Sequence, residues 1–328
     1  MNSIDNKQET SDIGLDTLFN FFKNLNANTT EDTDPTMENF NVHIDEDTDD
    51  ILNCYITENE IIKCIQCLKN NKACSNDRII NEYLKHTTDI MTPIYVHFFN
   101  LILDTGFLPE SWLEGIIRPI YKRKGDPYQP ENYRPITILS CFGKLFTSIL
   151  NARLHKFLEL NNILEENQAG FRTGYTTTDH IFVLHSLIEL LKVKKTKLFC
   201  SFIDFSKAFD SVWRVGLWMK LLGNNINGKI FRVIHNMYKN IKSCVSYNGE
   251  QSSFFQSFRG VRQGENLSPV LFAIFLNDLE SFLITNGASG VNLDLQHEQL
   301  TIFTKIYILL YADARSFLVQ MKNNFKIT

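Results

Sequence analysis

Apolar residues recur at helical spacing in several segments of the chain. Ile61 and Ile65 share one helical face directly after Thr57 and Glu60, which form a capping box, so a domain begins near residue 51. The same periodicity predicts further helices over residues 90–104, 140–160, 178–191, 228–240 and 268–285.

Shorter apolar runs predict strands between these helices. Residues 115–138 contain strands separated by turn residues, and residues 198–205 form an almost wholly apolar run that predicts a buried central strand. Asn248 and Gly249 mark a hairpin turn. Residues 306–311 and 316–320 are two apolar runs joined by a tight turn, and they predict a second hairpin with an acid at its tip.

The N-terminal part of the chain has a different composition. Residues 26–50 are polar and acidic, which predicts a solvated linker. Before it, Leu18 and Phe22 lie at helical spacing and predict a short helix that could dock on something outside this chain. The net charge is −13 over residues 1–60 and +9 over the remainder. An acidic segment therefore precedes a basic body, which is a weak indication of a polyanionic partner.

Composition narrows the class of protein. The 328 residues are 44% hydrophobic, enough for one large core or two modest ones. No apolar run approaches the ~20 residues that cross a bilayer, and no signal peptide follows Met1, so the sequence favours a protein that neither spans a membrane nor is secreted. Seven cysteines, an odd count, favour a reducing intracellular compartment, and Cys64 and Cys67 fit helix packing better than zinc binding.

Two acids lie in apolar strand contexts, where an unpaired carboxylate is costly. Asp204 lies in the run over residues 198–205, and Asp313 lies at the tip of the predicted C-terminal hairpin. Two such carboxylates can converge on a hard cation such as Mg²⁺, which prefers oxygen ligands. The pattern alone leaves open the alternative that each acid is satisfied separately by hydrogen bonds.

Six ordered motifs add a family resemblance. Residues 201–212 (SFIDFSKAFDSV), 260–279 (GVRQGENLSPVLFAIFLNDL) and 309–314 (LLYADA) resemble, in order and spacing, the three central palm motifs of reverse transcriptases from non-LTR, LINE-type retrotransposons. Upstream segments resemble the fingers motifs of the same family: 70–85 (NNKACSNDRIINEYLK), 131–154 (ENYRPITILSCFGKLFTSILNARL) and 167–181 (NQAGFRTGYTTTDHI).

The resemblance implies a fold and an activity. The fold is α+β, a right-hand polymerase with an antiparallel palm sheet backed by helices. Its parts are an acidic N-terminal segment and linker over residues 1–50, a fingers-like subdomain over 51–195 and an incomplete palm-like subdomain over 196–328. The implied activity is RNA-directed DNA polymerisation, with an RNA template, a DNA primer and dNTP as partners and Mg²⁺ in a two-metal site.

The resemblance also implies residue roles. Asp204 and Asp313 match the catalytic, metal-binding aspartates. Phe209 matches the steric gate beneath the sugar, and Gln263 and Gly264 match positions that contact the incoming nucleotide. The remaining matches are basic residues: Lys122, Lys124 and Arg134 in the fingers hairpin that grips the triphosphate, and Arg172 as a template contact. Asp210 is expected to make a structural hydrogen bond.

One departure from the family pattern bears on activity. The family hairpin carries two adjacent aspartates, and here the second position is Ala314, followed by Arg315. Alanine cannot bind a cation, and the arginine adds positive charge beside the site. The chain also ends at Thr328, before the rest of the palm and a thumb, so the sequence predicts a truncated and impaired copy. The alternative function is a non-catalytic, polymerase-like remnant that binds nucleic acid.

Overall fold

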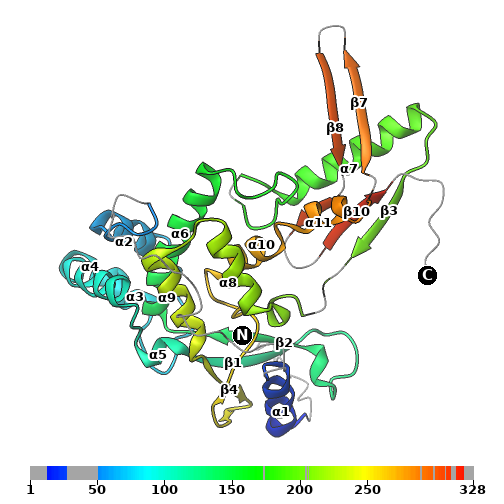
Figure 1. The fold of residues 1–328 in the computed structure, drawn as a ribbon. Helices are drawn as coiled ribbons and strands as arrows, with labels where there is room; N and C mark the ends of the chain where they lie inside the picture. The colour runs from blue at the N-terminus through cyan, green and yellow to red at the C-terminus, as the bar shows by residue number, and fades with distance from the viewer. Residues whose placement is uncertain are drawn as a thin grey trace, which may run out of the picture.

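Strands from distant parts of the sequence form the two main sheets of the fold (Figure 1). The computed structural model describes residues 13–27, 51–172, 174–203, 205, 207–288, 290–297, 300–306, 308–311 and 315–320. In the five-stranded sheet, β1 (Glu114–Tyr121) pairs antiparallel with β2 (Tyr133–Ile138) and parallel with β4 (Lys242–Tyr247). The short strands β5 (Glu250–Gln251) and β6 (Phe255–Gln256) pair with β4. This sheet therefore contains strands from both the predicted fingers-like subdomain, which ends at residue 195, and the predicted palm-like subdomain.

The second sheet is antiparallel and has the order β3-β10-β9. Its strands are β3 (Phe199–Ile203), β9 (Ile308–Tyr311) and β10 (Arg315–Gln320). The predicted C-terminal hairpin is confirmed, because Arg315 pairs with Tyr311 across its turn. A separate hairpin, β7 (Val291–His297) and β8 (Leu300–Ile306), extends away from the body beside α7 (Thr177–Val193) (Figure 1).

One sequence expectation about this sheet is wrong. Among the described strands, β3 lies at the edge of its sheet rather than at the centre. Phe199 and Phe202 on it are 56% and 62% exposed. An apolar run reports that side chains avoid water, but it does not identify the strands and helices that cover them.

Helices pack into one large apolar core beside the five-stranded sheet. Phe99, Phe146, Trp218 and Phe231 are fully buried in it. The remaining helices are α2 (Glu58–Gln66), α3 (Asn81–His86), α4 (Thr88–Thr105), α5 (Glu110–Leu113), α6 (Cys141–Leu160), α8 (Arg214–Gly223), α9 (Gly228–Lys239), α10 (Ser268–Leu276) and α11 (Leu279–Thr285), with 3₁₀ turns η2 (Pro130–Asn132) and η3 (Phe209–Ser211).

The helix predicted over residues 268–285 is instead two short helices. The break falls at Asn277, whose side chain accepts a hydrogen bond from the Glu165 amide at 3.0 Å and donates one to the Ile163 carbonyl at 2.8 Å. Side-chain hydrogen bonds of this kind compete with helix continuation. By length and composition Ser268–Thr285 could span a membrane. Here α10 lies in the core, with Val270 and Leu271 fully buried.

The N-terminal helix α1 (Leu15–Leu25) docks on this chain, and not outside it. Leu18 and Phe22 are 0% and 1% exposed because they pack on Ile117 of β1 and Val245 of β4. Figure 1 shows α1 beneath the five-stranded sheet, next to β1 and β2. The helical spacing predicted the element correctly, but its docking surface is formed by residues about 100 and 220 positions away, which no local pattern reports.

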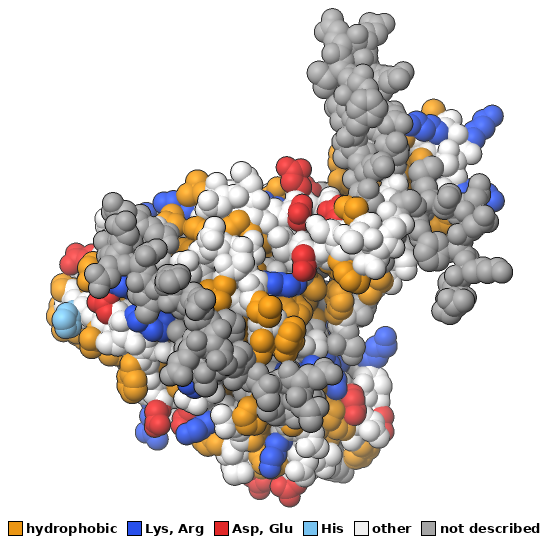
Figure 2. Space-filling view, in the orientation of Figure 1, with side chains coloured by type: hydrophobic (Ala, Val, Ile, Leu, Met, Phe, Trp, Pro, Cys, Tyr) orange, Lys and Arg blue, Asp and Glu red, His pale blue; other side chains and the backbone are white. Residues whose placement is uncertain are grey.

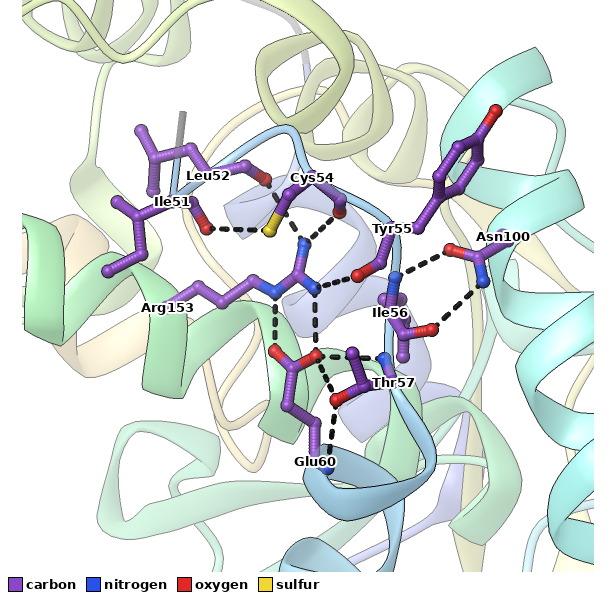
Figure 3. Close-up of polar contacts among 9 residues, drawn as sticks. All are labelled: Ile51, Leu52, Cys54, Tyr55, Ile56, Thr57, Glu60, Asn100 and Arg153. Atoms are coloured by element: carbon purple, nitrogen blue, oxygen red, sulfur yellow. Dashed lines mark hydrogen bonds and ion pairs between the residues drawn. The ribbon is translucent and has the colours of Figure 1, made fainter. Parts of the chain in front are cut away.

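Arg153 on α6 fastens the segment that enters α2 (Figure 3). Its guanidinium, 4% exposed, forms a bidentate pair with Glu60 at 2.6 and 2.9 Å. It also donates to the carbonyls of Cys54 at 2.6 Å and Tyr55 at 3.0 Å. Glu60 completes the predicted capping box with Thr57, which is confirmed. One buried side chain therefore ties residues 52–60 to the central helix of the core.

Candidate active site

The three-stranded sheet brings two predicted site segments to the same end. Ile203, the last residue of β3, pairs with Ser316 at the start of β10, directly after the β9–β10 turn. The chain therefore leaves β3 at the sheet end where the hairpin turns. Asp204, Asp313 and Ala314 themselves lie outside the described residues.

Asp210 lies on η3 and forms a hydrogen bond with Gln263. The Gln263 amide Nε2 donates to Asp210 Oδ2 at 3.1 Å, so the structural hydrogen bond expected of Asp210 is confirmed. Burial raises the pKa of the Asp210 carboxyl from 3.8 to about 6, although the charge of Lys207 and the Gln263 hydrogen bond lower it in part. This carboxylate is therefore costly to keep ionised at neutral pH.

Asp210→Asn is expected to stabilise the protein at pH 7.5. Because the folded-state pKa is raised, the native state binds the extra proton and loses stability as pH rises from 3.8 through about 6. Asparagine keeps the acceptor for Gln263 and carries no charge, so the free energy of unfolding should increase by about 1 to 3 kcal/mol.

Urea unfolding at pH 3.5 and pH 7.5 measures this effect. The increase in the free energy of unfolding of Asp210→Asn over the wild type should be small at pH 3.5 and should reach its predicted value at pH 7.5. Glu250→Gln, at an exposed position on β5, is the matched control, and its free energy of unfolding should stay close to that of the wild type at both pH values. A gain that is the same at both pH values would contradict the assignment.

The turn at Gln263 and Gly264 lies against the free edge of β2. The Gln263 carbonyl accepts a hydrogen bond from the Thr137 amide at 3.2 Å. Gly264 has φ 103°, and a Cβ at this position would lie 2.6 Å from the Thr137 carbonyl oxygen. Only glycine fits this backbone, so its close approach is to β2.

Phe209, the residue predicted to form the steric gate, packs in the core. Its ring is 8% exposed and stacks on Phe272 of α10, with centroids 5.2 Å apart. Phe171 meets it edge-on at 6.2 Å, and Phe171 has the unusual φ of 62°. Phe209 is thus held by rings on both sides and lies one residue from Asp210, whose side chain is bonded to Gln263.

The basic residues predicted for the fingers hairpin differ in their hydrogen bonds. Lys122 Nζ donates to the Glu131 carbonyl at 2.7 Å, whereas Lys124 and Arg134 are exposed. Arg134 pairs across the hairpin with Ile120, which is 54% exposed, so this outer face of β1–β2 is open to solvent. On the face of the molecule in Figure 2, Lys and Arg side chains are dispersed and do not gather in one patch.

Arg172 is extensively engaged within the chain. It forms a bidentate pair with Glu159 at 2.8 and 2.9 Å and donates to the Glu165 carbonyl at 3.1 Å. The hydrogen bond from Arg172 lowers the pKa of the Glu159 carboxyl. Its guanidinium also lies over the ring of Tyr175, 4.4 Å from the centroid. The geometry gives this arginine a role in fixing the turn that carries Phe171.

Comparison with known proteins shows the family. A family model described as reverse transcriptase (RNA-dependent DNA polymerase) matches residues 120–326, well over half of the chain. The chain belongs to the reverse transcriptase family. The expected α+β class is confirmed by the structure, and the right-hand polymerase fold is the one this family has.

The relatives point to non-LTR elements. The chain is 30% identical to a probable RNA-directed DNA polymerase from transposon X-element of Drosophila melanogaster, over 67% of this chain and 24% of that protein. It is 29% identical to the RNA-directed DNA polymerase from mobile element jockey of Drosophila funebris, over 72% and 25%. It thus spans about a quarter of the length of these curated relatives. The expected LINE-type membership is confirmed.

A solved structure of apo telomerase from Candida tropicalis, truncated from the C-terminal domain, also resembles this chain. It has 16% sequence identity and a TM-score of 0.41, and the match covers 76% of this chain and 52% of the other.

Sequence reasoning missed a buried ion pair in this reverse transcriptase domain. Arg262 and Glu265, 7% and 3% exposed, lie 3.4 Å apart and flank the Gln263–Gly264 turn. Glu265 also accepts a hydrogen bond from Thr147 of α6 at 2.6 Å, and the Arg262 carbonyl accepts one from Ser268 at 2.7 Å. Opposite charges three residues apart between two apolar segments were the available signal. The pair anchors both ends of the turn.

The family uses divalent metal ions, and the structure allows one test of fit. In the described part of the chain, no cluster of three or more His, Cys, Asp or Glu side chains could hold a metal. The registers of β3, β10 and β9 nevertheless bring Ile203 and Tyr311, the last described residues before Asp204 and Asp313, to one sheet end. Carboxylates there would supply the oxygen donors that a hard cation prefers, so the donor set fits.

Proposed function

We propose that this chain is the fingers and palm portion of an RNA-directed DNA polymerase from a non-LTR retrotransposon. The observation that carries the proposal is the register that brings the end of β3 and the β9–β10 turn together, in a chain of the reverse transcriptase family. Its substrates are an RNA template, a DNA primer and dNTP. Asp204 and Asp313 are the candidate catalytic and metal-binding residues.

Each proposed contact follows from the chemistry of an accessible group. The exposed cations of Lys124 and Arg134 bind the triphosphate oxygens, with Arg134 suited to two parallel hydrogen bonds, while Lys122 supports the hairpin through its bond to Glu131. Gln263, held by Asp210, faces the nucleotide next to Gly264. Phe209, although 8% exposed, is the candidate residue that restricts the sugar.

Template binding is proposed for the turn that Arg172 fixes. Phe171 and Tyr175, 36% and 37% exposed, offer rings on which bases stack. Arg172 contributes through its positive charge and by holding these rings in place.

When bound, a pair of Mg²⁺ ions would supply the charge that activates a primer hydroxyl and stabilises the leaving pyrophosphate. Asp204 and Asp313 would hold them, in a two-metal site that lacks one carboxylate because position 314 is alanine. Alanine offers no oxygen ligand, and Arg315 adds a like charge near the cations. We therefore propose that polymerisation by this chain is weak.

A second candidate function follows from the same alanine. A polymerase-shaped domain without effective chemistry would still bind nucleic acid through the fingers, as a non-catalytic remnant. Ala314 favours this alternative, whereas Asp204, Arg134 and Gln263 favour the polymerase.

A paired measurement of binding and primer extension tests the proposal. With poly(rA) primed by oligo(dT), Mg²⁺ and dTTP, we expect salt-dependent binding and a low level of incorporation. Asp204→Asn should abolish incorporation and keep binding, while the exposed control Asp89→Asn should change neither. Binding with no incorporation above that of Asp204→Asn selects the remnant, and the absence of binding contradicts both functions.

A further inference from the structure

The C-terminal end of α1 contacts a segment that leads to the candidate nucleotide site. Asn26, the residue after the helix, accepts a hydrogen bond from the Phe258 amide through its carbonyl at 3.0 Å. Its side-chain Oδ1 accepts another from Ser257 Oγ at 2.9 Å. The same asparagine and Phe22 line a small cavity together with Asp210 and Gln263. The C-terminal end of α1 therefore lies beside the candidate site.

Arg214 holds the same segment from the side of the core. It is 5% exposed, and its guanidinium donates to the carbonyls of Ser257, Arg259 and Gly260 at 2.9 to 3.0 Å. It also donates to the Tyr238 carbonyl of α9 at 2.9 Å. Residues 257–260 are thus held between a buried arginine and the end of α1.

The position of this segment sets the position of the proposed gate. The Val261 amide donates to the Phe209 carbonyl at 2.8 Å, and the Gly260 amide donates to the Val212 carbonyl at 2.9 Å. A Cβ on Gly260, whose φ is 78°, would lie 2.8 Å from backbone atoms of Phe209 and Asp210. Such close backbone contact transmits a small shift directly, because packed interiors leave little room to absorb it.

We infer that α1 is a positioning element of the nucleotide site and that Asn26 is its positioning residue. The inference rests on the proposed function. Asn26 fixes residues 257–260, these fix Phe209 and Asp210, and Asp210 in turn orients the Gln263 amide. Leu18 and Phe22 cover the sheet and explain why the helix docks, but they do not touch this segment through hydrogen bonds. Helix α1 lies outside residues 120–326, which the family model matches.

Asn26→Ala tests this inference. The substitution removes the acceptor of Ser257 Oγ and also the Nδ2 donor to the Phe22 carbonyl within α1. Loss of the bond to Ser257, the one that reaches the segment, on average changes an equilibrium by about 5-fold. Amide hydrogen exchange at Phe258, Gly260 and Val261 should accelerate by about that factor. The Kd for dTTP should rise similarly, measured on the full chain bound to poly(rA) and an oligo(dT) primer that ends in a dideoxynucleotide, with Mg²⁺ present.

Two further variants separate positioning from general stability. Asn26→Asp keeps an acceptor oxygen for Ser257 at the position of Oδ1, although it loses the Nδ2 donor to the Phe22 carbonyl, and it should restore both exchange and dTTP binding. Asn24→Ala removes an exposed asparagine from the same helical turn and should change neither. Thermal melting of all three should stay close to that of the wild type, since Leu18 and Phe22 are unchanged.

Three outcomes would overturn the inference, and they are distinguishable. If exchange accelerates in Asn26→Ala but dTTP binding is unchanged, α1 serves the fold alone. If neither changes, Asn26 does not hold the segment. If the wild type itself binds no dTTP, the proposed function fails and the inference falls with it.

Discussion

Arg153→Met is expected to lower the free energy of unfolding by about 3 kcal/mol, the lower end of the range for breaking a buried ion pair, because Glu60 is 31% exposed. Methionine fills a similar volume but cannot donate to Glu60 or to the carbonyls of Cys54 and Tyr55, which would remain partly buried without this donor (Figure 3). Chemical denaturation followed by circular dichroism gives the value.

Lys156→Met is the matched control, since it removes a cation from an exposed position one turn further along α6. It should cost less than about 0.5 kcal/mol. An equal decrease in the free energy of unfolding in the two variants would show that the contacts of the buried guanidinium do not stabilise the fold.

The effect of Arg153→Met should also depend on pH. Burial raises the pKa of the Glu60 carboxyl, but hydrogen bonds from Arg153 and Thr57 outweigh this and hold it below its usual 4.5. A lowered pKa stabilises the native state above pH 4.5, and this contribution disappears as pH falls through the folded-state pKa. The difference in the free energy of unfolding between Arg153→Met and the wild type should therefore decrease at acidic pH.

Restoring the missing carboxylate is expected to tighten Mg²⁺ binding. Ala314→Asp adds a hard oxygen ligand, and Arg315→Thr removes an adjacent like charge. Even an indirect ligand contact typically changes metal affinity by ~10 to 100-fold, so the double variant should gain at least that much. Titration calorimetry with Mg²⁺ measures the change.

The control places the same charges at a different position of the turn. Ala312→Asp with Arg315→Thr has an identical net charge, and it should bind Mg²⁺ more weakly than the restored variant. Polymerase activity gives a second test. It is measured in a chimaera in which this chain is followed by the C-terminal segment of an active relative. If this chimaera polymerises equally well with Ala314 and Arg315 in place, the prediction of impairment is wrong.

Local sequence patterns predicted where helices and strands occur better than they predicted which other elements each one packs against. The helix over Cys141–Leu160 and the β9–β10 hairpin follow from periodicity and turn chemistry, which are properties of neighbouring residues. The edge position of β3 and the break at Asn277 depend on residues far along the chain. The surface beneath α1 was unpredictable for the same reason, since Ile117 and Val245 come from separate strands.

The candidate site shows the same division. Motifs singled out Gln263 and Gly264 as nucleotide contacts and Asp210 as a residue with a structural hydrogen bond, and the structure shows that Gln263 is the partner of Asp210. They did not reveal that Arg172 is paired with Glu159 or that Arg214 supports residues 257–260. Charged residues look alike in sequence whether they bind a ligand or a backbone carbonyl.

Because α1 docks on its own chain, its binding depends on an uncut peptide between the helix and the rest of the protein. Residues 28–50 join the helix covalently to the rest of the chain, and a covalent connection makes docking intramolecular, which raises the effective concentration of the helix at the sheet. Modest intrinsic affinity of Leu18 and Phe22 for the sheet is then sufficient to keep the helix bound. A single proteolytic cut within residues 28–50 would make the association bimolecular. The cut protein would retain α1 in concentrated solution and lose it on dilution.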